Sequence, residues 1–144
     1  MLRVVVDANV YVSACIRPEG PPGQIIEQFL SGEAFEIVLS TPIVEEVLRA
    51  LEYPKVRKAV RSKVEPAVWF EDILVLAQLV GGEDGSAGVS RDPDDDKYIA
   101  AAIEGRAVFV VTGDPDLLAI GQHEGVRFVG PRAFLDFLRM SDSR

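Results

Sequence analysis

Residues 91–118, RDPDDDKYIAAAIEGRAVFVVTGDPDLL, contain a helix, a strand and the acidic residues that together decide the fold. An apolar helical pattern covers 94–104 and is closed by Gly105, a typical C-cap residue. The run AVFVVT at 107–112 is short and rich in valine, which is typical of a strand buried on both faces of a parallel sheet. A helix followed at once by such a strand indicates an α/β fold.

The alternation of strands and helices extends along the whole chain. We expect further strands at 2–6, 35–40, near Val89 and at 126–129, and an apolar segment from Asp7 to about Ile16. Helices are expected at 24–30, 41–51, 55–61, 66–80, 94–104, 114–121 and 131–140, with Thr41 as the N-cap of the second. The pattern predicts one three-layer α/β/α domain over residues 1–144 with a central parallel sheet.

The composition is that of a soluble globular protein. Of 144 residues, 48% are hydrophobic and 26% are charged, which excludes a disordered chain. No apolar run reaches the roughly 18 residues of a membrane span, and the N-terminus lacks a signal-peptide pattern, so we expect a cytoplasmic protein without membrane contact. The single cysteine, Cys15, excludes an internal disulfide, and the single histidine, His123, is expected in a loop.

The net charge of −8 bears directly on possible partners. A protein that binds nucleic acid usually carries a basic surface, so this charge argues against such a partner. The exception is a chain whose acidic residues gather around a divalent metal, because the metal reverses the local sign of charge. The location of the acidic residues therefore decides the question.

Two acidic residues directly follow predicted strands. Asp7 comes after the strand at 2–6, and Asp114 follows the strand at 107–112. Ligands of open parallel sheets bind beyond the carboxyl ends of the strands. We therefore expect Asp7 and Asp114 to meet at one edge of the sheet.

Helical geometry ranks the acidic residues of the run at 92–96. Asp96 shares the inward stripe of its helix with Ile99 and Ile103, whereas Asp95, beside Tyr98, is a weaker candidate. An alternative explanation stays open, because acidic residues at a helix N-terminus also cap the helix and complement its dipole.

The same helical geometry favours Glu46 over Glu45 as a candidate site residue. Glu46 flanks the apolar face of the helix at 41–51, beside Ile43 and Ala50, whereas Glu45 points to the outer face.

Four crowded carboxylates repel one another, and a hard divalent cation relieves that repulsion. An oxygen-only ligand set favours Mg²⁺ or Mn²⁺.

Three segments carry acidic residues: VVVDANVYVSA at 4–14, STPIVEEVLRALEYPK at 40–55 and DPDDDKYIAAAIEGRAVFVVTGDPDLL at 92–118. In this order, they resemble the acidic segments of the PIN domain family. The run through YPK most resembles the prokaryotic toxins of toxin–antitoxin systems. The resemblance implies a PIN-like fold and a ribonuclease that uses Mg²⁺ or Mn²⁺.

The resemblance also implies roles for individual residues. The catalytic metal ligands would be Asp7, Glu46, Asp96 and Asp114, with Asp95 and Asp116 as second choices. Asn9, Thr41 and Thr112 would be supporting polar residues, although capping or turn formation explains these three equally well. An RNA substrate, a cognate antitoxin and a homodimer are the implied partners.

Other interpretations stay open. The fold could be a catalytically silent module that binds RNA or protein. A phosphatase of the haloacid dehalogenase type is less consistent, since it needs an Asp where this chain has Asn9. A set of basic residues could follow an RNA backbone or form a solvated helical face; it comprises Arg49, Lys55, Arg57, Lys58, Arg61 and Lys63.

Overall fold

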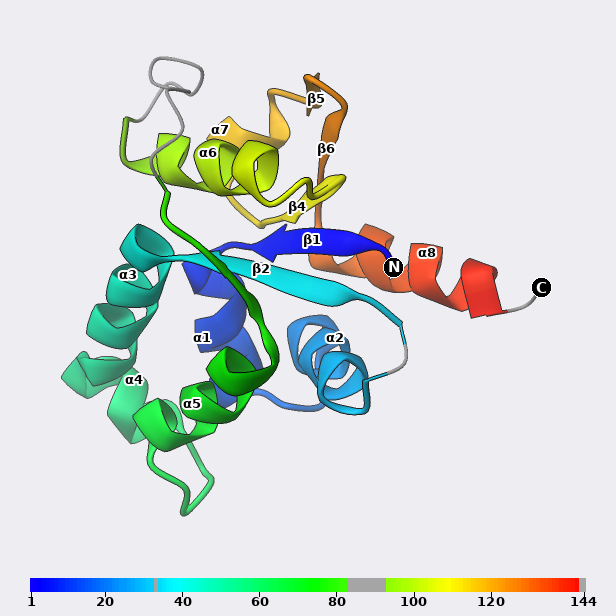
Figure 1. The fold of residues 1–144 in the computed structure, drawn as a ribbon. Helices are drawn as coiled ribbons and strands as arrows, with labels where there is room; N and C mark the ends of the chain where they lie inside the picture. The colour runs from blue at the N-terminus through cyan, green and yellow to red at the C-terminus, as the bar shows by residue number, and fades with distance from the viewer. Residues whose placement is uncertain (33, 83–92, 143–144) are drawn as a thin grey trace.

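The strands that precede the acidic residues are neighbours in a six-stranded sheet. The computed structural model describes residues 1–32, 34–82 and 93–142, and its strand order is β3-β2-β1-β4-β6-β5 (Figure 1). The strands are β1 (Arg3–Val6), β2 (Glu36–Ser40), β3 (Gln78–Val80), β4 (Phe109–Val111), β5 (Gln122–His123) and β6 (Val126–Val129). All pairings are parallel except that of β5 with β6.

Helices cover both faces of this sheet, which confirms the three-layer α/β/α prediction. The helices are α1 (Ala8–Ile16), α2 (Pro21–Leu30), α3 (Thr41–Glu52), α4 (Pro54–Ala59), α5 (Pro66–Leu76), α6 (Asp96–Glu104), α7 (Pro115–Leu118) and α8 (Pro131–Asp142), with a 3₁₀ turn, η1 (Pro93–Asp95), before α6. Figure 1 shows α6 and α7 on one side of the sheet and α1 to α5 on the other, and α8 packs against α2.

The central strands are buried on both faces. Val4, Val5 and Val6 of β1 have no exposed surface, and the same is true of Val110 and Val111 of β4. Consecutive buried residues, rather than alternating ones, are expected where helices cover both sides of a parallel sheet. The valine-rich runs of the sequence therefore form the centre of the core.

The predicted helix at 66–80 is wrong in its last residues. α5 ends at Leu76, Ala77 takes an extended conformation, and β3 follows directly. β3 pairs in parallel with β2, where Ser40 lies opposite Val80. An apolar run of this length fits either structure locally, so pairing with β2 decided the outcome.

The N-terminal ends of α2 and α3 also differ from prediction. α2 begins at Pro21 rather than at Gln24, because prolines are favourable in the first helical turn, where no N–H is needed. α3 is capped by Ser40 rather than by Thr41: the Ser40 hydroxyl accepts a hydrogen bond from the Ile43 N–H at 3.4 Å. Thr41 is instead the first residue of the helix.

His123 lies in β5 and not in a loop, because Gln122 and His123 pair with β6 across a tight turn. Glu124 in that turn has φ of 48° and Gly125 has φ of 81°. The strand predicted near Val89 falls outside the described residues. Within the described ranges, no helix is both long enough and apolar enough to cross a bilayer.

Candidate active site

Asp7 lies at the carboxyl edge of the sheet and is only 4% exposed. It caps α1, since its Oδ1 accepts a hydrogen bond from the Asn9 N–H at 3.2 Å. Its Oδ2 accepts a hydrogen bond from the Thr112 hydroxyl at 2.7 Å. Because β1 and β4 pair with Val6 opposite Val111, the residues that follow them are brought side by side, as predicted from the strand ends.

Burial raises the pKa of Asp7 above its usual value. The hydrogen bonds from Thr112 and the Asn9 N–H oppose this shift, and the nearby carboxylate of Glu46 adds to it. The ionised form of Asp7 is therefore costly without a positive charge close by.

Glu46 is held by two neighbours from the start of α6. The Tyr98 hydroxyl donates a hydrogen bond to Glu46 Oε1, and Lys97 Nζ lies 3.1 Å from Glu46 Oε2. Tyr98 is buried, and its oxygen also accepts a hydrogen bond from the Ala8 N–H at 3.2 Å. Tyr98 thus connects α1, α3 and α6 around the site.

Asp114 follows β4 and caps α7. Its N–H donates to the Thr112 hydroxyl oxygen at 3.0 Å, and its Oδ1 accepts from the Asp116 N–H at 2.9 Å. The Thr112 hydroxyl therefore contacts both Asp7 and the backbone of Asp114. This explains why a polar residue with no exposed surface stands at position 112.

These residues surround one cavity of about 260 Å³, which we call the acidic cavity. Four carboxylates from separate segments line it, those of Asp7, Glu46, Asp95 and Asp114. The remaining lining residues are Ala8, Asn9, Arg49, Ala50, Tyr53 and Tyr98.

Asp95, the second choice of the sequence, lies on the cavity wall, and Asp96 does not. Residues 93–95 form a 3₁₀ turn, and the α-helix begins only at Asp96. A 3₁₀ turn has three residues per turn instead of 3.6, so an α-helical projection does not apply to Asp95, which precedes the α-helix. A role for Asp96 in catalysis stays a prediction.

The remaining predicted residues differ in whether they line the acidic cavity. Asn9 lines the acidic cavity, and Thr112 does not line it but donates a hydrogen bond to Asp7, which does. Thr41 is exposed and does not line the cavity. Asp116 is also absent from the wall, and its backbone N–H holds the Asp114 carboxylate.

Comparison with known proteins agrees with this geometry. Residues 3–116 match the sequence family described as PIN domain. The chain belongs to the PIN domain family. An uncharacterized protein of Methanocaldococcus jannaschii, MJ1680, is 31% identical over 122 residues, which cover 83% of this chain and 75% of that protein.

A solved structure shares the fold of this PIN domain. It is the crystal structure of VapBC2 from Rickettsia felis bound to a DNA fragment from their promoter. The match covers 90% of this chain and 98% of the other, with a TM-score of 0.58 and 12% identity. At that identity the likeness concerns the fold alone.

The donor set of the acidic cavity fits a hard divalent cation in its chemistry, because its side-chain ligands offer oxygen. The side chains are not gathered for binding as they stand: within the described part of this PIN domain, no three Asp, Glu, His or Cys side chains converge closely enough to hold a metal ion. Both carboxylate oxygens of Glu46 already have a partner, Tyr98 for one and Lys97 for the other.

Sequence reasoning missed three residues of the site, Tyr53, Lys97 and Tyr98, and named Arg49 only as one of a basic set. A signal existed for Tyr98, since it lies near Ile99 and Ala102 on the inward stripe and a buried hydroxyl needs a partner. The local sequence gives no comparable signal for the others, because their positions depend on how α3 meets α6.

Proposed function

We propose that this PIN domain is a metal-dependent ribonuclease that hydrolyses phosphodiester bonds within RNA. One observation carries the proposal: Asp7, Glu46, Asp95 and Asp114 come from four separate segments and line the same cavity. Family membership supports it, because an acidic cavity at the carboxyl edge of a parallel sheet is where such a fold binds ligands.

The four carboxylates would hold Mg²⁺ or Mn²⁺. Such an ion, when bound, polarises the phosphodiester and lowers the pKa of a water nucleophile. The protein's own part is to fix the donors: Thr112 orients Asp7, and the Asp116 N–H orients Asp114. Because Asp7 is buried, its charge acts in a medium of low dielectric constant, where it attracts a cation strongly.

We further propose that the protein is the toxin of a toxin–antitoxin system and acts in the cytoplasm. The shared fold with a chain of VapBC2 supports this, as does the resemblance of the segment through YPK. A cognate antitoxin and a homodimer follow as proposed partners.

A second candidate is a silent module that binds RNA or protein. The ion pair between Lys97 and Glu46 favours it, since Lys97 already supplies a positive charge beside the acidic cavity. The two candidates differ in whether a divalent ion replaces that contact.

Cleavage of a mixed, end-labelled RNA pool in Mn²⁺, Mg²⁺ or EDTA tests the proposal. The wild type should cut only with metal. Asp114→Asn and Asp95→Asn should each lose more than about 100-fold in rate, beyond the loss typical of residues that only support a ligand. Asp72→Asn, which changes an exposed acid of α5, is the matched control and should cut normally.

Asp96→Asn decides between the two neighbouring acids. Loss of cleavage in Asp96→Asn but not in Asp95→Asn would contradict the assignment of Asp95. Metal binding without cleavage of any RNA would contradict the nuclease and favour the silent module.

A further inference from the structure

A second depression adjoins the acidic cavity on the outer face of α3. We call it the outer groove; it is shallow and open to solvent, its volume is about 550 Å³, and it is lined mainly by apolar surface. Its residues are Glu45, Leu48, Arg49, Glu52 and Tyr53. Arg49 and Tyr53 also line the acidic cavity, so the two spaces meet at these side chains.

Tyr53 presents its ring to solvent at this boundary. It separates α3 from α4, with an extended backbone (φ −58°, ψ 133°) that the following Pro54 favours. Its relative exposure is 63%, and no ring contact among the described residues involves it. The ring therefore lies where the acidic cavity and the outer groove meet, with its face available to another planar group.

Arg49 places a positive charge at the same boundary. Its side chain is exposed, and none of the ion pairs between described residues includes it. A guanidinium group forms paired hydrogen bonds with phosphate oxygens. Between a cavity of carboxylates and an apolar groove, such a group suits a phosphate that links the two spaces.

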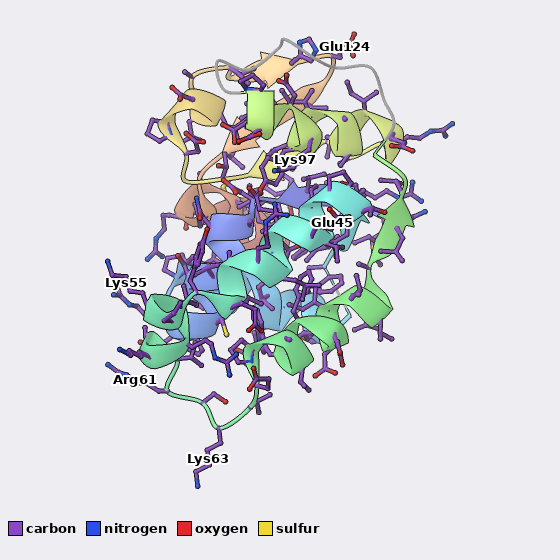
Figure 2. All side chains as sticks on the ribbon, turned by 90° about the vertical axis from the view of Figure 1, so that its left-hand side faces the viewer. Glu45, Lys55, Arg61, Lys63, Lys97 and Glu124 are labelled. Carbon is purple, nitrogen blue, oxygen red and sulfur yellow. The ribbon has the colours of Figure 1, made fainter. Side chains whose placement is uncertain are left out.

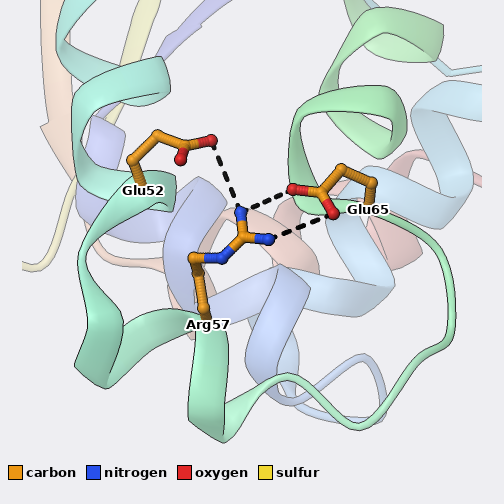
Figure 3. A network of polar contacts seen from close by, with 3 residues as sticks. All are labelled: Glu52, Arg57 and Glu65. Atoms are coloured by element: carbon orange, nitrogen blue, oxygen red, sulfur yellow. Dashed lines mark hydrogen bonds and ion pairs between the residues drawn. The ribbon is translucent and has the colours of Figure 1, made fainter.

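The far side of the outer groove is fixed by a polar network. Arg57 Nη1 lies 3.5 Å from Glu52 Oε1 and 2.5 Å from Glu65 Oε1, which ties the end of α3 to the start of α5 (Figure 3). Glu45, on the face of α3 seen in Figure 2, supplies a second carboxylate to the lining. The carboxylates of Glu45 and Glu52 can accept hydrogen bonds from the amino groups of nucleobases.

We propose that the outer groove binds one unpaired base of a single-stranded RNA, beside the phosphate that enters the acidic cavity. Tyr53 stacks on this base, and Arg49 binds the phosphate between it and the cavity. The inference rests on the proposed ribonuclease function, because the cavity defines which phosphate is cut. An unpaired base is required, since both faces of a base in a duplex are already stacked.

Binding of a fluorescent single-stranded RNA of about ten nucleotides tests the proposal. Anisotropy is measured in EDTA and again in Ca²⁺, so that affinity is separated from cleavage. Tyr53→Ala should weaken binding about 5- to 150-fold, the range found for loss of one stacked base. Tyr53→Phe keeps the ring and should bind like the wild type, as should Leu76→Ala, which removes an exposed apolar side chain from α5.

A series of RNAs with one abasic nucleotide locates the contact. One abasic position should weaken binding to the wild type and leave binding to Tyr53→Ala unchanged, because the same contact is already lost. Equal losses in both proteins overturn the proposal, and so does absence of binding by the wild type in both buffers. A change in the mass of the particle in solution, without a change in RNA affinity, would assign the outer groove to a second copy of the chain.

The same experiments separate this inference from the proposed function. Metal-dependent cleavage with normal RNA binding by Tyr53→Ala refutes the base site and keeps the nuclease. Binding that depends on Tyr53 without any cleavage keeps the base site and refutes the nuclease.

Discussion

At the scale of single residues, Asp7 combines a functional position with a cost in stability. Burial raises its pKa, so ionisation at neutral pH destabilises the folded state relative to the unfolded chain. We predict that Asp7→Asn raises the free energy of unfolding by about 0.5–2 kcal/mol in EDTA at neutral pH, the usual size of a stabilising substitution. Asparagine can still accept hydrogen bonds from Thr112 or the Asn9 N–H.

The gain in stability predicted for Asp7→Asn should depend on pH in one direction. The pKa of Asp7 is 3.8 in the unfolded chain and higher in the folded protein. Its ionisation therefore begins to destabilise the folded state above pH 3.8, and the cost grows until the pH exceeds the folded pKa. The advantage of Asp7→Asn over the wild type, measured by urea unfolding, should therefore shrink as pH falls from about 7 toward about 4. A constant advantage, or a similar one in Asp72→Asn, would contradict the explanation.

Tyr98 and Tyr11 offer a matched pair of buried hydroxyl groups. The Tyr98 hydroxyl contacts Glu46 and the Ala8 N–H, and burial raises its pKa so that it remains a donor. The Tyr11 hydroxyl makes no hydrogen bond within the described structure. Tyr98→Phe should cost about 1–3 kcal/mol in thermal or urea unfolding, because it leaves a buried N–H unsatisfied, whereas Tyr11→Phe should be neutral or stabilising. Equal effects would show that the contacts of Tyr98 contribute nothing.

At the scale of elements, Gly105 sets the distance between α6 and the sheet. A Cβ atom at this position would overlap both γ-carbons of Val38 in the centre of β2. Because α6 carries Tyr98 and follows Asp95, a shift of this helix also moves the wall of the acidic cavity. We predict that Gly105→Ala destabilises the protein by about 1–3 kcal/mol, the usual cost of overpacking, in a thermal unfolding measurement.

Gly113→Ala is the control for this prediction. A Cβ atom there would meet nothing within 4 Å, so the substitution should leave stability unchanged or slightly higher. A similar loss in both variants would indicate a backbone effect of alanine rather than a clash with Val38.

Which elements could be predicted depended on how locally they are determined. β1 and β4 were predictable because their consecutive valines fit a doubly covered strand, and α6 because Gly105 closes it. β3 was not, since Gln78–Val80 becomes a strand only by pairing with β2. β5 has two residues and depends on the turn at Glu124 and Gly125.

Whether a site residue could be predicted also depended on how locally its position is determined. The meeting of Asp7 and Asp114 was predictable, because adjacent parallel strands end at one edge. The place of Asp95 on the cavity wall depended on a 3₁₀ turn that residue patterns do not reveal, and the role of Asp96 stays a prediction. Whether these acids bind metal, and whether residues 1–144 act as one domain, stay predictions.

At the scale of the whole molecule, the net charge of −8 is distributed unevenly. Figure 2 shows Lys55, Arg61 and Lys63 projecting from one end of the face that carries Glu45 and Lys97. Arg57 is engaged by Glu52 and Glu65, but Lys55, Lys58 and Arg61 are exposed and make no ion pair with a described residue. An RNA strand that leaves the outer groove toward α4 would therefore meet positive charge after the acidic cavity.

The salt dependence of RNA binding distinguishes such a contact from a merely solvated face. For single strands, the slope of log K against log salt changes by about 0.7 for each phosphate neutralised. Replacing Lys55, Lys58 and Arg61 together by alanine should therefore weaken binding and reduce the slope by about 2. Arg106, Arg127 and Arg132 are exposed residues from other parts of the molecule, and their replacement removes the same charge. If both triple variants lose affinity equally, only net charge matters; if only the α4 variant loses slope, this end of the molecule holds the RNA backbone.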